Sequence, residues 1–305
     1  MNAFPFALEL CGAKLHNKSM KIQIAEHYGL CFGVRDAIAQ AERLAAQAPL
    51  TILGELVHNP VVRERLAQRG VREDALDGES AATAQVMITA HGASDRKRAE
   101  WRDAGFGVAD GTCPLVRHAH TQLGLLVSLG CLPVVIGKRG HVEVEGLIGD
   151  FPDACVVENE DDISRLPQHA SYGVISQTTQ PVEKVRAFVE AIRRARPQSE
   201  VRFTNTVCQP TKNRQNALHK LIAECDTMVV VGGRNSNNTV QLVSAARTAG
   251  LTVFHIERAE ELDPAWFRDA ENVGITAGTS TLRETVAAVH ARLRQFADSL
   301  STAIA

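Results

Sequence analysis

The sequence has few aromatic residues and no excess of charge of either sign. Phe, Trp and Tyr make up 5% of its 305 residues, and the formal net charge at pH 7 is -2. Proteins that bind nucleic acid need a basic surface for the phosphate backbone and often aromatic side chains on which bases stack. We therefore expect no nucleic acid partner, and an anionic ligand must be held by local groups rather than by the overall field.

Long apolar runs are missing as well. The longest, residues 123–137, contains Ser128 and falls short of the ~20 apolar residues that a membrane helix needs. We expect no membrane span. Residues 1–19 have neither a basic start nor a small-residue cleavage site, which argues against a secretory signal. Met20 could be the true start of the chain, so residues 1–19 are left out of the fold prediction.

Cysteines at short paired spacing are also absent. The seven cysteines are an odd, widely spaced set without a Cys-x-x-Cys pair. This pattern fits reduced intracellular thiols better than a disulfide framework, so the cytoplasm is the expected location. With 45% hydrophobic residues the chain can bury a sizeable core, and its length predicts two or three domains.

What the sequence does contain is one pattern that occurs three times. Each unit begins with a short β-like stretch that ends at a cysteine, at residues 21–31, 107–113 and 201–208. The apolar spacing of an amphipathic helix follows each cysteine. An apolar strand and a polar loop come next. The offset from cysteine to loop is 27 residues in the first unit (31 to 58) and 28 in the others (113 to 141 and 208 to 236).

Each unit has two apolar strands that end in polar loops. The first strands are predicted at 50–53, 132–136 and 228–231, and the second at 86–89, 172–175 and 273–276. Alternating strands and helices imply parallel sheets, with the loops at the carboxyl ends of strands, where such sheets bind ligands. We predict an α/β fold of three pseudo-threefold related lobes. The predicted parts are an N-terminal arm with the first strand (1–30) and lobes at 31–112, 113–207 and 208–305, the last with a C-terminal helix.

Cys31, Cys113 and Cys208 each stand at a strand end just before a helix. Helix amino termini favour the thiolate, and packing does not require a cysteine at the same place in every unit. We predict that these thiolates converge and hold a cubane iron-sulfur cluster by three of its irons, leaving one iron open. Zinc is the alternative metal, although structural zinc expects four ligands. The other cysteines are interpreted as small core residues or incidental: Cys11, Cys131, Cys155 and Cys225.

The polar loops offer the groups that a phosphorylated substrate needs. Singly, a strand-end histidine or a Ser/Asn loop is more often structural, but their common position across the repeats favours binding. Glu143 and Thr178 could relay a proton to a departing hydroxyl group. Glu55 and Glu145 are interpreted as helix-start or solvated residues, and the histidines of the second helix, His118 and His120, as surface positions. The predicted binding residues are His58, His91, His141, Ser236, Asn237, Asn238 and Ser280.

With these residues in place, the sequence resembles the 4-hydroxy-3-methylbut-2-enyl diphosphate reductase family, which catalyses the last step of the non-mevalonate isoprenoid route. The similarity runs from about residue 20 to residue 293. The matching stretches are Gly29-Leu30-Cys31-Phe32-Gly33-Val34, Val57-His58-Asn59, Ala90-His91-Gly92, Thr112-Cys113-Pro114-Leu115-Val116, Gly140-His141-Val142-Glu143-Val144-Glu145-Gly146, Gln177-Thr178-Thr179, Cys208 with Thr211 and Asn213-Arg214-Gln215, Asn235-Ser236-Asn237-Asn238, and Thr276-Ala277-Gly278-Thr279-Ser280.

The resemblance implies a trefoil of three lobes around a 4Fe-4S cluster whose open iron takes the substrate hydroxyl. It assigns cluster ligation to Cys31, Cys113 and Cys208, and proton handling to Glu143 and Thr178. The histidines and the Ser/Asn residues given above would bind the diphosphate. The products would be isopentenyl and dimethylallyl diphosphate, with electrons supplied by a ferredoxin or flavodoxin.

Five positions depart from the usual family pattern. Val142 stands where the family commonly has Pro, Asn237 where it has Ser, Thr281-Leu282 where it has Ala-Pro, and Leu30 where it has Phe. These changes spare the cysteines and Glu143 but alter the diphosphate loops. Two alternatives therefore stay open: a paralogue that reduces another allylic or phosphorylated alcohol, and a non-catalytic cluster protein that senses iron or oxygen.

Overall fold

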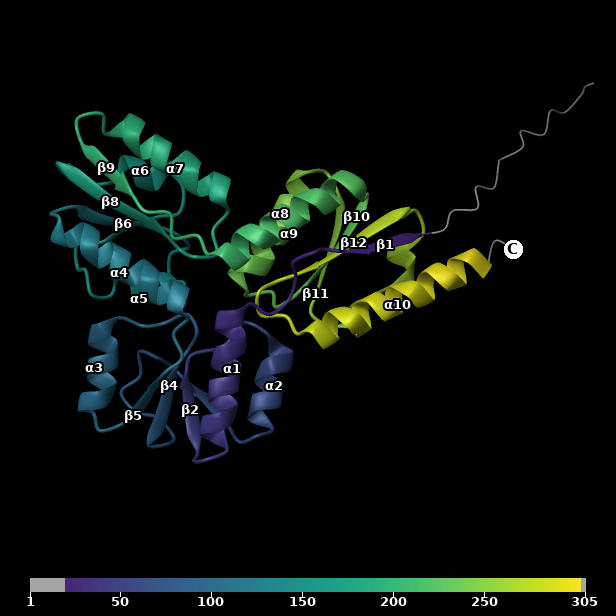
Figure 1. The fold of residues 1–305 in the computed structure, drawn as a ribbon, viewed down its shortest axis with the longest axis horizontal. Coiled ribbons are helices and arrows are strands. Elements are labelled where there is room, and N and C mark those ends of the chain that lie inside the picture. Colours follow the sequence, from purple (N-terminus) through teal and green to yellow (C-terminus); the bar gives the residue numbers. More distant parts are fainter. Residues whose placement is uncertain (1–19, 303–305) are drawn as a thin grey trace, which may run out of the picture.

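Three lobes meet at the centre of the molecule in the computed structural model, which describes residues 20–302 (Figure 1). Over these residues the strands form three four-stranded sheets in which every pairing is parallel. The predicted α/β fold class is thereby confirmed. The predictions for residues 1–19, including Cys11, lie outside the described part of the chain. No helix within it combines the length and the apolarity needed to cross a membrane.

The first lobe, drawn in purple and blue in Figure 1, contains a sheet with the strand order β3-β2-β4-β5. Its strands are β2 (Leu50–Leu53), β3 (Arg72–Asp74), β4 (Gln85–Ile88) and β5 (Gly107–Asp110), and its helices are α1 (Phe32–Ala45), α2 (Pro60–Ala67) and α3 (Asp95–Asp103). The central strands are buried because helices cover the sheet. All three residues of β3 are exposed and charged, so the hydrophobic pattern gave no signal for this edge strand.

The second lobe repeats the arrangement with the strand order β7-β6-β8-β9. Its strands are β6 (Leu132–Ile136), β7 (Cys155–Val157), β8 (Ser171–Ser176) and β9 (Glu200–Phe203), and its helices are α4 (Pro114–Ser128), α5 (Val142–Ile148), α6 (Glu160–Ser164) and α7 (Val182–Ala195). Every residue of β6 is buried, as is usual for a central strand of a parallel sheet that is covered on both faces.

The third lobe has the order β1-β12-β10-β11, and so it includes the first strand of the chain. Its strands are β1 (Lys21–Ile24), β10 (Thr227–Val231), β11 (Thr252–Ile256) and β12 (Asn272–Ala277). Its helices are α8 (Gln209–Glu224), α9 (Asn237–Thr248) and α10 (Arg283–Thr302), with short 3-10 turns at η1 (Ala259–Glu261) and η2 (Pro264–Phe267). Because β1 pairs with β12, the two ends of the chain close the ring of lobes (Figure 1).

The strand before each cysteine is an edge strand next to the closing strand of one sheet, and the helix after it begins the next lobe. The amide of each cysteine donates a hydrogen bond to a carbonyl in the loop after that closing strand: Cys31 to Thr279 (3.1 Å), Cys113 to Ala90 (3.0 Å) and Cys208 to Thr178 (2.9 Å). The three repeats of the sequence pattern therefore place their cysteines in the same local structure, at a helix start that is bonded to the loop after a closing strand. The lobe limits at 31–112, 113–207 and 208–305 stay a prediction.

Candidate functional site

A small cavity of about 30 Å³ lies where the three lobes meet. Each lobe contributes loops from the carboxyl ends of its strands, as expected for parallel sheets. Eight of the residues that the sequence singled out line it: His58, His91, His141, Glu143, Ser236, Asn237, Asn238 and Ser280. Thr179 lines the cavity as well.

Three imidazole rings form one wall of the cavity. The ring centroids of His58 and His91 are 4.7 Å apart, and each lies 5.6 Å from that of His141. Burial lowers the pKa of His91 well below 6.5 and that of His141 to about 4, with further lowering from the neighbouring His58 in both cases. At neutral pH, His91 and His141 are therefore uncharged. They can act as hydrogen-bond donors without repelling one another.

The orientation of His58 is fixed by a carboxylate. Its Nδ1 lies 2.8 Å from Glu55 Oε2, and the other oxygen of Glu55 accepts from Arg63 at 2.9 Å. A carboxylate partner favours the tautomer that carries the proton on Nδ1. The opposite atom, Nε2, is buried and has no partner in the structure, and neither does His91 Nδ1. Buried polar atoms without partners at the wall of a cavity indicate a polar ligand.

The opposite wall is the amino terminus of α9. Ser236 is its N-cap and accepts from the amide of Thr239, while Asn238 accepts from the amide of Thr279 at 3.1 Å. A helix amino terminus with free donors stabilises an anion. Asn237, which departs from the usual family pattern, donates to Thr179 Oγ1 at 2.8 Å and so joins the third lobe to the second.

Contact between the first and third lobes depends on a glycine. A Cβ at Gly233 would overlap the carbonyl oxygen of His58, so a side chain there would push the lobes apart. Asn59 donates to the carbonyl of Ser280 at 2.7 Å across the same boundary. These contacts hold His58 and Ser280 against each other.

Glu143 is the carboxylate of the site. Its side chain is 2% exposed, and Oε1 accepts from the amide of Thr178 at 2.6 Å. Burial raises its pKa to about 7, although hydrogen bonds from the backbone and side chain of Thr178 lower it. A carboxyl group with this pKa can carry a proton at neutral pH and release it. Thr178 contacts this carboxyl group but is not among the residues that line the cavity.

Cys113 and Cys208 each interact with Cys31 and with Glu143. Burial raises the pKa of both thiols, and the charges of Cys31 and Glu143 add to the rise. A Cβ at Gly33 would overlap the sulfur of Cys113, so the absence of a side chain there lets the two cysteine segments approach.

Burial is the largest influence on these thiols. It raises the pKa of Cys113 and raises that of Cys208 to about 11, and it outweighs the helix amides that lower both values. Thiols of this kind keep their protons at neutral pH unless a metal displaces them. The helix amides lower the pKa of these thiols, as predicted, but burial raises it by more. The net result is a preference for the protonated thiol.

A buried cation lies beside the cysteines. Arg214, in α8, is 4% exposed, and its Nε has no hydrogen-bond partner in the described part of the chain. No carboxylate in residues 20–302 forms an ion pair with it. Burial lowers its pKa, and the Cys31 and Cys208 thiolates oppose that shift. The residues thus fit an anionic group bound to the cysteines.

The family model described as LytB protein matches residues 22–294 of the chain. The chain belongs to the LytB protein family. This match confirms the resemblance that the sequence motifs indicated, and it covers all three lobes.

Curated relatives support the same conclusion. The 4-hydroxy-3-methylbut-2-enyl diphosphate reductase of Aquifex aeolicus is 36% identical over 288 residues, which span 91% of this chain and 97% of that one. The enzyme of the same name from Xylella fastidiosa strain M12 is 36% identical over 288 residues, with 90% of each chain covered.

Two solved structures share the fold. The reductase structure from Plasmodium falciparum aligns with a TM-score of 0.82 over 88% of this chain and 86% of that one, at 24% identity. A second structure, of the (E)-4-hydroxy-3-methyl-but-2-enyl diphosphate reductase called the terminal enzyme of the non-mevalonate pathway, is 36% identical. It has a TM-score of 0.66 and covers 90% of this chain and 99% of that one.

Several residues escaped the sequence interpretation. Glu55 was interpreted as a helix-start or solvated residue, but it orients His58. Arg214 carried no signal beyond its place in a motif, because one of its two partners is the carbonyl of Gly29 in a distant segment and the other is a carbonyl of its own helix. By contrast, Glu145 is an exposed residue of the first turn of α5 that accepts from the amide of Gly140 at 3.0 Å.

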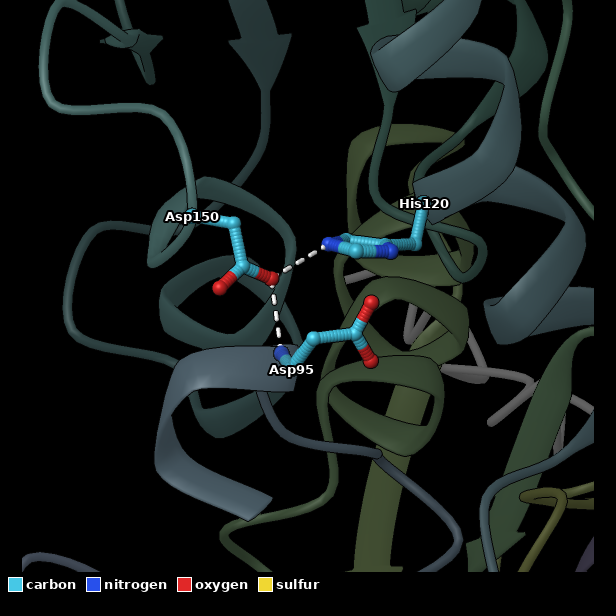
Figure 2. A group of neighbouring side chains, drawn as sticks. All are labelled: Asp95, His120 and Asp150. Carbon is cyan, nitrogen blue, oxygen red and sulfur yellow. Dashed lines mark hydrogen bonds and ion pairs between the residues drawn. The ribbon is translucent and has the colours of Figure 1, made fainter. Parts of the chain in front are cut away.

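His120 was wrongly interpreted as a surface residue. Figure 2 shows it beside Asp95 and Asp150, in a group whose ligand atoms lie within 4.8 Å of one another. Asp150 accepts from His120 Nε2 at 2.9 Å and from the amides of Asp95 and Arg96 at 2.7 and 2.9 Å. The carboxylate of Asp95 pairs with Arg98. Because these acceptors are already engaged, we interpret the cluster as a hydrogen-bonded contact between α3 of the first lobe and the second lobe.

A wider cavity of about 450 Å³ adjoins the small one and shares His58, His141 and Asn237 with it. Lys138 and Lys184 line this outer space, and neither forms an ion pair among the described residues. Arg234 and one carboxylate, Glu158, line it as well, so the charged side chains of the outer cavity are mostly positive and favour an anion next to His58 and His141.

The buried histidines and Glu143 should give opposite dependences of stability on pH. The folded-state pKa of His141 is below its unfolded value, so between about pH 4 and 6.5 the unfolded chain binds more protons and stability rises with pH. The folded-state pKa of Glu143 is above its unfolded value, so between about pH 4.5 and 7 its contribution falls as pH rises.

Glu143→Gln should therefore make the stability of the metal-free protein rise more steeply between about pH 5 and 6.5 than in the wild type. Denaturant midpoints measured across this range would check the prediction, with Glu145→Gln as the control on the same helix. An unchanged slope in Glu143→Gln would contradict the raised pKa.

Proposed function

We propose that this chain is an oxidoreductase that removes the hydroxyl group of 4-hydroxy-3-methylbut-2-enyl diphosphate and yields isopentenyl and dimethylallyl diphosphate. One observation carries the proposal: a wall of histidines and a helix amino terminus face the same small cavity as a buried, protonatable Glu143 that lies near three cysteines. The names of the relatives that match over nine tenths of the chain support this substrate.

Cys31, Cys113 and Cys208 would hold a 4Fe-4S cluster. The fit rests on three features: thiols at the amino termini of three helices, the close approach that Gly33 permits, and the unpaired guanidinium of Arg214. When bound, such a cluster supplies electrons and an open iron that acts as a Lewis acid toward the substrate oxygen. Zinc fits less well, because structural zinc expects four protein ligands and the site offers three cysteines.

The residues of the chain bind and orient the substrate. His91 and His141 donate to the diphosphate from one side, where His58 lines the same wall, and Ser236, Asn238 and Ser280 donate from the helix amino terminus. Asn237 extends this wall to Thr179. Because burial keeps His91 and His141 neutral, they can donate hydrogen bonds to the diphosphate without repelling one another.

Glu143 holds the proton that the reaction needs. The overall reaction breaks one C–O bond, consumes two electrons and two protons, and releases water. The carboxyl group of Glu143 donates a proton to the departing oxygen, and the hydrogen bonds from Thr178 fix its position. A non-catalytic sensor would have no need for a buried acid beside a phosphate-type cavity, so we favour the enzyme.

We further infer that the electrons come from a ferredoxin or flavodoxin and that the protein works in the cytoplasm. All six cysteines in the described part of the chain are free, which fits a reducing compartment.

The test is a turnover assay with anaerobically purified protein, a reduced one-electron dye and 4-hydroxy-3-methylbut-2-enyl diphosphate. We expect both isopentenyl and dimethylallyl diphosphate as products. A parallel assay with other allylic or phosphorylated alcohols separates this activity from that of a paralogue. Absence of turnover in protein with a full cluster would rule the proposal out.

A further inference from the structure

Arg214 joins the segments that carry two of the three cysteines. Its Nη1 donates to the carbonyl of Pro210 at 2.8 Å, and its Nη2 donates to the carbonyl of Gly29. Pro210 lies two residues after Cys208, and Gly29 lies two residues before Cys31. The guanidinium therefore spans the junction between the third lobe and the start of the first, next to the segments that carry Cys31 and Cys208.

The charge of Arg214 is not balanced by a carboxylate. Within residues 20–302 it forms no ion pair, its side chain is 4% exposed, and its Nε has no partner. Buried charges are found paired, because removing an ion from water costs several kcal/mol. The anionic groups that face it are the sulfurs of Cys31 and Cys208. The position of Arg214 and its unpartnered Nε are therefore both consistent with an interaction with the group that those sulfurs bind.

We propose that Arg214 is a positioning residue whose fixed positive charge raises the reduction potential of the group held by Cys31, Cys113 and Cys208. The inference rests on the proposed function. The step concerned is the gain of one electron by the cysteine-bound iron-sulfur group from a ferredoxin-type or flavodoxin-type donor, which is itself oxidised. No bond is made and no proton is needed.

The physical basis is the net charge of the site. Three thiolates make it negative, and an added electron makes it more so, in surroundings from which water is largely excluded. A cation nearby stabilises the reduced state more than the oxidised state, and the net charge and hydrogen bonds around the sulfurs are known determinants of such potentials. Arginine suits this role because it keeps its charge when buried, and a lysine at the same position would be kept charged by the neighbouring thiolates.

A purely structural role is the competing explanation. The two hydrogen bonds to Gly29 and Pro210 would hold the segments together whatever the charge. Arg214→Gln removes the charge but keeps a donor, Arg214→Met removes both, and Arg214→Lys keeps a charge with a different set of donors. Comparison of the three variants separates charge from tethering.

The experiment is a redox titration of anaerobically purified protein, followed by electron paramagnetic resonance, with iron and sulfide measured in every sample. Against the wild type, we expect Arg214→Gln and Arg214→Met to show at least a tenfold lower ratio of reduced to oxidised cluster at a fixed poise. For a one-electron couple this is a shift of about 59 mV to lower potential. Arg214→Lys should stay closer to the wild type.

Arg117→Gln is the matched control. Arg117 lies on α4, the corresponding helix after Cys113, but it is exposed and pairs with Asp110 at 3.0 Å. Solvent screens its charge, so its loss should leave the potential unchanged.

Each outcome decides between the alternatives. A wild type that binds no iron or sulfide contradicts the proposed function itself. A full cluster with an unchanged potential in Arg214→Gln overturns the inference about Arg214, as does a shift in Arg214→Lys as large as in the neutral variants. If both neutral variants lose the cluster while the lysine variant keeps it, the charge is needed to retain the group, which supports the inference. Loss in all three variants favours tethering and overturns it.

Discussion

Replacing Cys113 by serine should leave a folded protein that has lost most of its iron and sulfide and turns over at the background rate. Cys113 is the N-cap of α4, next to Gly33 and in electrostatic contact with Cys31 and Glu143. A serine hydroxyl does not ionise near neutral pH and is a poor ligand for iron in an iron-sulfur cluster. Iron and sulfide analysis, visible absorption and turnover would check this.

The matched control is Cys155→Ser. Cys155 is a half-buried cysteine in β7 that packs against the core of the second lobe, and its sulfur donates to the carbonyl of Asp153 at 3.7 Å. This variant should keep the cluster and the activity of the wild type. A full complement of iron in Cys113→Ser, with circular dichroism like that of the wild type, would contradict the assignment of Cys113 as a ligand.

Replacing Glu143 by glutamine should lower kcat by about 10²- to 10⁴-fold while the cluster stays in place. Glutamine has nearly the same shape and keeps an oxygen that can accept from the amide of Thr178. It cannot supply a proton to the departing hydroxyl group. The variant therefore separates proton delivery from structure, and comparison of kcat and KM with iron content would check it.

The dependence of activity on pH gives a second readout of the same residue. The pKa of Glu143 is raised to about 7, so the wild type should lose activity as pH rises above this value and the acid loses its proton. That decline should be missing from the residual activity of Glu143→Gln. Glu145→Gln, an exposed neighbour on α5, should keep both the rate and the decline. Turnover of Glu143→Gln at the wild-type rate would show that another group delivers the proton.

The sequence was sufficient to locate the central strands and the cysteines because both depend on local patterns, whereas the exposed, charged edge strand β3 gave no such signal. The central strands β2 and β6 have the predicted limits, since continuous apolar runs mark strands that are buried on both faces. The loops that form the cavity follow directly from these strands. Long-range pairing was harder to predict: β1 and β12 lie at opposite ends of the chain, and nothing local shows that they are neighbours.

The supporting residues of the site were missed for a related reason. Arg214 donates to the carbonyl of Gly29, a partner that only the folded chain brings close. Glu55 lies three residues before His58, but no sequence pattern distinguishes its hydrogen bond to that ring from a solvated carboxylate. Charged residues of this kind are usually solvated, so sequence alone favours the wrong interpretation. The helix amides were expected to favour thiolates, but the degree of burial that raises the pKa of Cys208 becomes visible only in three dimensions.

The most direct test of the account is a Mössbauer measurement, with iron and sulfide analysis, on wild-type protein labelled with iron-57 and purified without oxygen. We expect about four iron and four sulfide per chain, with one iron distinct from the others because three cysteines leave it without a protein ligand. Addition of the hydroxylated diphosphate should change the signal of that iron alone. Zinc in place of iron, or a cluster whose irons all respond alike, would contradict the account.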